Sequence, residues 1–230
     1  MTSGEILNCL QVVEAERKRR RATPGLSARV DSIKLFQQQR FAVTYADLLA
    51  SDRYAPAAMF FLEELYGPGD FARRDAQFAR VVPAMLRLFP ASMVDSVAAL
   101  AELHALSETL DTAMGEQVRA PLDSTSYAAA WRCCGNREGR GRQISLTISL
   151  GRALDQLTRK ALLRKSLGLM RGVATKAGLG EIQSLLERGF DAFAAMGGAE
   201  EFLALVESRE RLLAERLFSL TADREWINSP

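Results

Sequence analysis

Residues 181–220 read EIQSLLERGFDAFAAMGGAEEFLALVESRERLLAERLFSL, and this stretch is the clearest indication of the fold. From Ile182 to Met196, apolar side chains recur at the i, i+3, i+4 and i+7 spacing of one buried helix face. Gly197 and Gly198 end this helix, and the same periodicity resumes at Phe202. Because so short a connection makes consecutive helices antiparallel neighbours, we predict that the chain ends in a helical hairpin.

Helical periodicity extends through the rest of the chain, interrupted at proline and glycine positions where helices end or begin. We therefore predict an all-α protein, a single multi-helix bundle of about 8 to 9 helices covering residues 1–230 as one domain. A weak subdivision near 121–141 is the alternative, although no linker composition demands it. The further predicted helices span 4–22, 27–52, 55–66, 71–89, 92–119, 124–134 and 140–176, the last of which is either one helix or a broken one.

One segment carries a competing pattern, because residues 143–150, QISLTISL, alternate polar and apolar side chains as a half-buried strand does. A strand needs a partner, and the other alternation, at Phe41, Val43 and Tyr45, is short. We therefore predict a helix here that is buried on two sides.

Composition limits the classes of protein to be considered. The net charge of +2 does not predict a nucleic-acid partner for the whole molecule, and the 48% hydrophobic content is that of a globular chain. The three cysteines make no even disulfide framework, and apolar residues precede the charges at the amino end, the reverse of a secretory signal. No apolar run reaches the roughly 20 residues that cross a bilayer. We expect a cytoplasmic protein, with no membrane span, from a bacterial genome rich in alanine and arginine codons.

Residues 60–66 read FFLEELY and are followed by GPGDFARRDAQFARVVP. This region resembles an uncharacterised family of bacterial proteins named after the FFLEELY heptad, and RFAVTYADLL at 40–49 is similar to another part of the same signature. The resemblance implies kinship and no assigned activity, so it designates no catalytic residue.

On a helical wheel, Phe60 falls outside the apolar arc of the heptad, between Glu63 and Glu64. In one interpretation Phe60 is an exposed aromatic that contacts another chain or a second copy. In the other, the two carboxylates enter the interior and pair with cations of the following helix. The cations nearest in sequence are Arg73, Arg74 and Arg80.

Four more polar residues occupy unexpected helical positions. Asp75 falls on the apolar side of its segment, unless it caps that helix. His104, Glu108 and Asp111 share one helix face, where a histidine with two carboxylates could move protons or hold an ion. The alternative is that a separate apolar stripe on this helix is buried and leaves both carboxylates in water.

Histidine and cysteine usage excludes most metal chemistry, since one histidine and two adjacent cysteines supply none of the usual ligand spacings. No phosphate-binding glycine loop and no G-x-S-x-G motif occurs. We therefore expect no metal and no cofactor, and a non-enzymatic protein rather than an enzyme.

Residues 137–176 are strongly basic, whereas 181–225 are net acidic. The basic helix could pack beside acidic ones, or it could form a surface that binds anions or nucleic acid. The candidate anion-binding residues are Arg152, Arg159, Lys160, Arg164 and Lys165.

The sequence thus leaves three functions open. The first is a helical interaction or regulatory protein, a homo-oligomer or partner-binding module whose surface includes Phe60. The second is a small-ligand-binding or enzymatic bundle with a buried polar pocket. The third is anion or nucleic-acid binding through 137–176. The burial of Glu63, Glu64, Asp75 and His104 distinguishes the second from the others.

Overall fold

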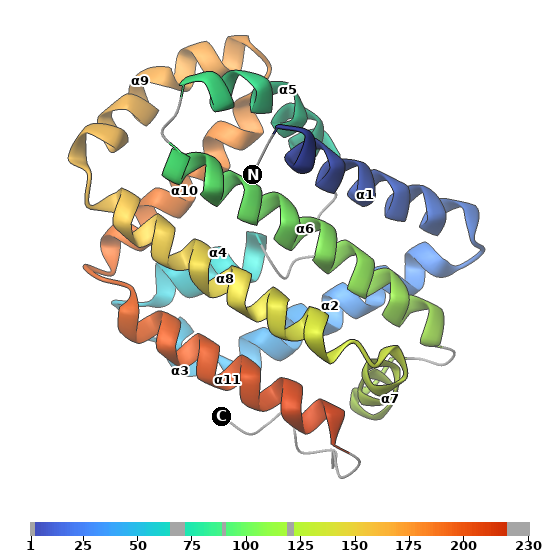
Figure 1. Cartoon of the computed structure of the whole chain (residues 1–230). Helices are drawn as coiled ribbons and strands as arrows, with labels where there is room; N and C mark the ends of the chain where they lie inside the picture. The colour runs from blue at the N-terminus through green and yellow to red at the C-terminus, as the bar shows by residue number, and fades with distance from the viewer. Residues whose placement is uncertain (1–2, 65–71, 89–90, 119–121, 220–230) are drawn as a thin grey trace.

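The chain folds into a helical bundle, seen in a computed structural model that describes residues 3–64, 72–88, 91–118 and 122–219 (Figure 1). This part of the chain contains eleven helices and no strand, so the all-α prediction is confirmed. The helices are α1 (Ser3–Ala22), α2 (Leu26–Thr44), α3 (Ala46–Leu49), α4 (Ala55–Glu64), α5 (Ala72–Leu88), α6 (Ala91–Gln117), α7 (Ser124–Cys134), α8 (Arg137–Thr158), α9 (Ala161–Lys176), α10 (Gly180–Ala195) and α11 (Glu200–Phe218).

The prediction of 8 to 9 helices is too low because two of the predicted helices are each divided. Tyr45, with φ −116° and ψ 25°, leaves the helical region between α2 and α3. Lys160, with φ −97° and ψ 90°, does so between α8 and α9. Just before it, Thr158 Oγ1 donates a hydrogen bond to the Asp155 carbonyl at 2.7 Å. Neither break contains the proline or glycine that would have indicated it.

Residues 143–150 are helical and lie within α8, as predicted. In Figure 1 this helix runs between α6 and α11, and it also packs on α10. Leu146 and Ile148 are buried, and Ile144 is half-buried. A helix covered on two sides needs apolar residues on two sides, which explains the alternating pattern that resembles a strand.

The terminal hairpin is the structural prediction that needs correction. Gly197 and Gly198, with φ 66° and 132°, turn the chain as expected. However, α10 packs mainly on α9, α8 and α4, whereas α11 packs mainly on α8 and α7. The two helices meet near their connection, where the ring centroids of Phe193 and Phe202 lie 6.5 Å apart. Because α8 offers apolar surface to both, each helix packs on it instead of along its sequence neighbour.

The apolar core consists of three clusters instead of one continuous layer. The largest surrounds Phe61 and Phe202, the second surrounds Trp131, and the third includes Ile6 and Val82. A cavity inside the bundle is lined by members of all three, so it lies where they meet.

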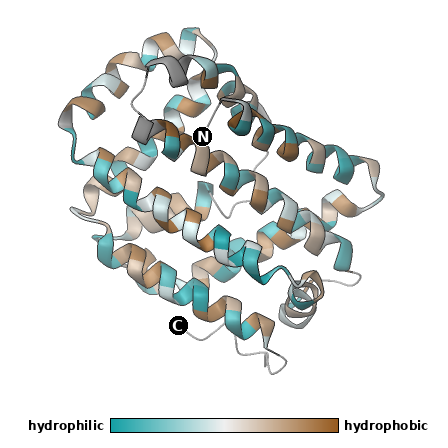
Figure 2. Ribbon diagram, viewed as in Figure 1, coloured by the Kyte–Doolittle hydropathy of each residue, from teal (hydrophilic) through white to brown (hydrophobic). Residues whose placement is uncertain are grey.

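Figure 2 shows polar and apolar residues interspersed along the helices. Within the described ranges, every helix is either too short or too polar to cross a membrane.

Candidate functional site

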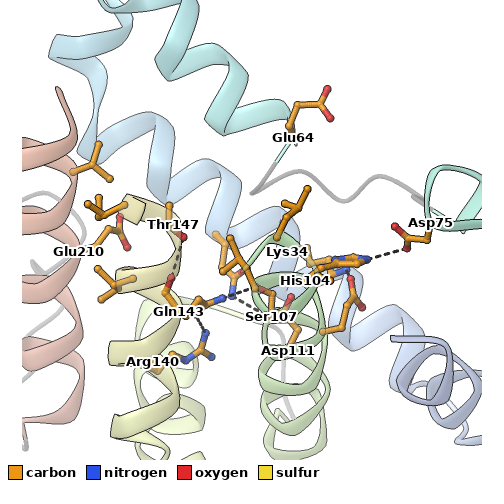
Figure 3. A pocket seen from close by; sticks show the side chains of 18 of the residues that line it. Lys34, Glu64, Asp75, His104, Ser107, Asp111, Arg140, Gln143, Thr147 and Glu210 are labelled. Atoms are coloured by element: carbon orange, nitrogen blue, oxygen red, sulfur yellow. Dashed lines mark hydrogen bonds and ion pairs between the residues drawn. The ribbon is translucent and has the colours of Figure 1, made fainter. Parts of the chain in front are cut away.

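The interior cavity has a volume of about 250 Å³ and receives side chains from α2, α6 and α8 (Figure 3). Lys34, Asp111 and Gln143 come from these three helices, with Asp75 and Glu210 on opposite sides of the view. Polar groups held inside a bundle must be paired or must contact something else that satisfies them. The predicted site residues that line the cavity are Glu64, Arg74, Asp75, His104, Glu108 and Asp111.

One corner of the cavity is formed by Asp75, His104 and Arg17. His104 Nε2 lies 2.8 Å from Asp75 Oδ2, and Arg17 Nη2 donates to the same oxygen at 2.6 Å. Burial raises the pKa of the Asp75 carboxyl, but the hydrogen bonds and charges of His104 and Arg17 outweigh burial and lower the pKa overall. An ionised carboxylate only accepts, so Nε2 carries the proton that faces it. Asp75 therefore orients the imidazole as well as pairing with α1.

Glu108 joins two cations from separate helices. Its Oε2 accepts from Arg20 of α1, and its Oε1 accepts from Lys34 Nζ of α2 at 2.7 Å. Arg20 also donates to the Glu108 carbonyl and, through Nε, to Thr112 Oγ1 at 2.8 Å. Burial raises the pKa of Glu108, whereas Lys34 and Arg20 lower it, and the net shift is downward. Glu108 is thus an ionised, paired carboxylate on the cavity wall.

Asp111, one turn further along α6, has a different environment. Its Oδ1 accepts a hydrogen bond from Gln37 Nε2 at 3.1 Å, and within the described part no cation lies within ion-pair distance of it. Burial raises the pKa of this carboxyl, with Lys34 and Arg140 opposing the shift from further away. The pKa values of the two carboxylates that share one helix face therefore shift in opposite directions, because only Glu108 has contacting cations.

The carboxylates of the heptad are separated by the fold. Glu64 is largely buried at the cavity edge and accepts from Arg74 of α5 and from Arg188 of α10. Glu63 is exposed and does not line the cavity. Arg80 donates to the Ala177 carbonyl instead of a heptad carboxylate. Leu65, Tyr66 and the side chain of Arg73 lie outside the described residues.

Phe60 does not occupy the exposed position that the contact-surface interpretation requires. Its ring is half-buried and packs against the largest apolar cluster. A Cβ added at Gly189 of α10 would lie 2.9 Å from Phe60 Cζ, so the ring sits directly on the α10 backbone. Of the two interpretations of the heptad, the structure supports the second for Glu64, because α10 covers the side of α4 that lies outside the apolar arc and Glu64 pairs with Arg74.

Several lining residues escaped the sequence analysis. Arg40 and Glu210 line the cavity, and the Glu210 carboxylate accepts from Arg40 and, at 2.8 Å, from Tyr45 Oη behind the wall, which links α2 to α11. Arg140, on α8, is buried at the cavity wall. Its position was readable, because Arg140 precedes Ile144 and Ile148 by four and eight residues and so shares their buried helix face.

The candidate anion-binding residues mostly have acidic partners. Arg152 approaches Glu200 at 3.4 Å, Arg159 pairs with Asp155 at 2.7 Å, and Arg164 pairs with Asp191 at 2.7 Å. Lys160 and Lys165 are exposed. Three of the five candidate residues are thus paired with neighbouring acidic side chains.

Across the described ranges, no three His, Cys, Asp or Glu side chains are grouped closely enough to hold a metal ion. The chemistry that the cavity offers is therefore hydrogen bonding, ion pairing and the imidazole of His104.

Comparison with known proteins assigns the chain to a family but gives no activity. No curated protein and no solved structure matches the chain. A family model described as Domain of unknown function (DUF8198) matches residues 16–224, which include every residue of the cavity wall except Leu10. The chain therefore belongs to the DUF8198 family.

Proposed function

We propose that this protein binds a small organic molecule in its interior cavity. The observation that supports the proposal is the convergence of charged and hydrogen-bonding side chains from several helices on one partly open cavity of about 250 Å³. Ligand pockets are concave, largely apolar and equipped with a few well-placed polar groups, and this cavity has that composition. The proposal concerns binding and assigns no reaction.

Native mass spectrometry tests the proposal on the purified chain. We expect a small molecule to accompany the folded protein and to leave on denaturation. In Thr147→Phe, the new ring occupies the cavity and the bound molecule is lost. Thr175→Phe is the matched control, because both threonines donate to a carbonyl one turn back in their own helix, but Thr175 is exposed on α9. Retention of the same molecule by Thr147→Phe overturns the proposal.

A second candidate function is interaction with an anionic lipid surface through α9. Leu162, Leu169 and Val173 are 78%, 83% and 63% exposed, and their spacing of seven and four residues places them on one helix face. Large aliphatic side chains at this exposure mark a surface that another partner covers.

Charge favours lipid over a second copy of the chain. Lys165 and Lys176 lie along one edge of this apolar face, and no carboxylate of the described residues lies within ion-pair distance of either. Two copies of α9 brought face to face would therefore repel each other. An apolar stripe bordered by lysines is typical of helices that lie in the interface of anionic membranes.

Flotation with phosphatidylglycerol and phosphatidylcholine vesicles tests this function. We expect binding to the anionic vesicles, and its loss when Leu162 and Leu169 are both replaced by serine. Leu35→Ser on α2, where Leu35 is 45% exposed, should leave binding unchanged. Equal binding to both vesicle types, or to neither, overturns the idea.

The protein–protein surface centred on Phe60 loses its support, because that ring packs on α10. The kinship with bacterial FFLEELY-motif proteins, the cytoplasmic location and a homo-oligomeric state stay predictions from the sequence.

A further inference from the structure

We propose that the ligand of the cavity is a small monocarboxylate, whose carboxylate binds Arg140 and Trp131 and whose apolar body lies against α6 and α8. This inference rests on the proposed function, since it names the chemistry of a ligand in the same cavity. Two buried hydrogen-bond donors support it. Among the described residues, Arg140 has no carboxylate partner and Trp131 Nε1 has no hydrogen-bond acceptor.

Arg140 is the first of these donors. The residue is only 5% exposed, and the groups that its guanidinium contacts are neutral: Gln143 Oε1 at 3.0 Å, Met114 Sδ at 3.0 Å and the Trp131 ring, whose centroid lies 3.9 Å from Cζ. The ring face attracts the cation but does not neutralise it. A guanidinium carries five N–H donors in a fork that matches a carboxylate, so most of its binding capacity remains unused.

The two other buried arginines show what Arg140 lacks. Arg20 binds the Glu108 carboxylate, and Arg40 binds the Glu210 carboxylate. Both are as buried as Arg140, at 7% and 6% exposure. Among the described residues, no carboxylate lies within ion-pair distance of Arg140. Burial of an uncompensated charge costs roughly several kcal/mol of folding free energy. A bound anion would offset this cost and stabilise the buried guanidinium of Arg140.

Trp131 is the second donor. Its indole Nε1 is buried and has no hydrogen-bond partner in the described structure, although the residue lines the cavity. An unsatisfied buried N–H is uncommon in folded proteins and calls for an acceptor. A carboxylate has two oxygens, so it can accept from the guanidinium and from the indole at the same time.

The charge balance of the lining favours a single negative charge. The other cations of the wall are paired, Lys34 with Glu108, Arg40 with Glu210 and Arg74 with Glu64. One uncompensated guanidinium matches a monocarboxylate better than a phosphate, which carries close to two charges at neutral pH. Asp111 lies on the same wall, and burial raises the pKa of its carboxyl, which favours the neutral form beside a bound anion.

The rest of the wall suits a hydrocarbon. Leu100 and Leu103 of α6, Ile144 and Ile148 of α8 and Leu185 of α10 line the same space. Contact with these side chains removes apolar ligand surface from water, which contributes about 25 cal/mol per Å². The volume of about 250 Å³ suits a ligand the size of a short fatty acid or a small aromatic acid.

Isothermal titration calorimetry with hexanoate, hexanamide, hexylamine and inorganic phosphate tests the inference. The three organic probes have similar shapes and differ in charge. We expect hexanoate to bind at least about tenfold more tightly than the neutral amide, because hydrogen bonds to charged groups are the stronger ones. Hexylamine and inorganic phosphate should bind more weakly than the amide or not at all.

Three variants assign the binding to the two donors. Arg140→Met should weaken hexanoate binding at least about tenfold, and its unfolding midpoint without ligand should not fall, since an apolar side chain replaces an uncompensated charge. Trp131→Phe should weaken binding by about 3- to 10-fold, the effect of one hydrogen bond. Arg142→Met is the control, because Arg142 is exposed on the same helix and pairs with Glu102.

The outcomes separate this inference from the proposed function. If hexanamide binds as tightly as hexanoate, and Thr147→Phe abolishes binding of both probes, the cavity binds ligands but does not recognise a carboxylate. If hexanoate binds Thr147→Phe as tightly as the native chain, the site lies elsewhere and both ideas fail for this probe. If hexanoate does not bind to the native chain, the inference that the ligand is a monocarboxylate is wrong. Native mass spectrometry still decides the proposed function.

Discussion

Glu108 is the residue on which the ion-pair network around the cavity depends. Its carboxylate, in a residue 4% exposed, contacts Arg20 from α1 and Lys34 from α2. Glu108→Gln leaves both cations without their counter-ion, and we expect the free energy of unfolding to fall by about 3–5 kcal/mol, the cost of breaking a buried pair. Urea denaturation followed by circular dichroism measures it.

Glu102→Gln is the matched control on the same helix. Glu102 pairs with Arg142, and their side chains are 32% and 55% exposed. Exposed ion pairs contribute about 1 kcal/mol or less to stability, so the free energy of unfolding of Glu102→Gln should fall only slightly. Similar losses in the two variants would contradict a special role for Glu108.

Asp111 should make stability depend on pH in a direction set by burial. Burial raises the pKa of its carboxyl above the ordinary value of 3.8, with Lys34 and Arg140 opposing and Glu108 reinforcing the shift. A group whose folded pKa is raised stabilises the fold below the unfolded pKa and loses that contribution as pH rises through the folded pKa. In Asp111→Asn, the side chain at position 111 is neutral at every pH. The unfolding temperature of this variant relative to the native chain should therefore increase as pH rises from about 4 toward 7. A difference that is constant or decreases over this range rejects the assignment.

At the residue scale, the sequence predicts helical neighbours well and partners poorly. His104, Glu108 and Asp111 share a face because their spacing and the helix period determine it. Arg20 and Lys34 could not be assigned to Glu108, because they are more than 70 positions away in the chain and reach it through the packing of α1 and α2 on α6. Tertiary contacts, absent from any local pattern, decide which carboxylate is paired.

Helix α8 is the element that organises the bundle, and two of its glycines test how closely it packs. A Cβ at Gly151 would lie 2.5 Å from Leu203 Cδ2 of α11, whereas nothing lies within 4 Å of one at Gly141. Gly151→Ala should lower the free energy of unfolding by about 1–3 kcal/mol through overpacking. Gly141→Ala should raise it by up to about 1 kcal/mol, because alanine favours the helix. Thermal unfolding of both variants gives the comparison, and two shifts of the same sign would contradict close α8–α11 contact at Gly151.

At the element scale, periodicity located the helices but not all of their neighbours. The break at Lys160 has no proline or glycine, so the sequence left a break in 140–176 open but did not locate it. The short turn between α10 and α11 predicted a hairpin, yet α8 presents apolar residues on two sides and competes for both helices. Sequence distance is therefore a poor guide to packing wherever one helix is apolar on more than one face.

In the whole molecule, the cavity follows from the way the core is divided. Three apolar clusters exclude water separately, and their polar edges meet between α2, α6 and α8. No sequence pattern indicates such a meeting point, because its wall is assembled from helices spread from α1 to α11. The sequence signals for its wall were polar residues on apolar helix faces, at Asp75, along α6 and at Arg140 of α8.

Helix α9 lies at the periphery of the bundle, and we expect it to be less stable locally than the central helices. It packs mainly on α10, and its described side chains are mostly exposed, Ala174 being buried. Segments with few buried contacts open at lower free energy than the global transition. Native-state hydrogen exchange should therefore give amides of α9 protection factors at least about tenfold below those of α6 and α8. Helix α11 lies closer to the carboxyl end of the chain than α9 but packs on α8 and α7, so it is the internal control and should resemble the centre. Equal protection in α9 and α6 would mean that the bundle unfolds as one unit, and that the exposed face of α9 is stabilised by contacts beyond those within the chain.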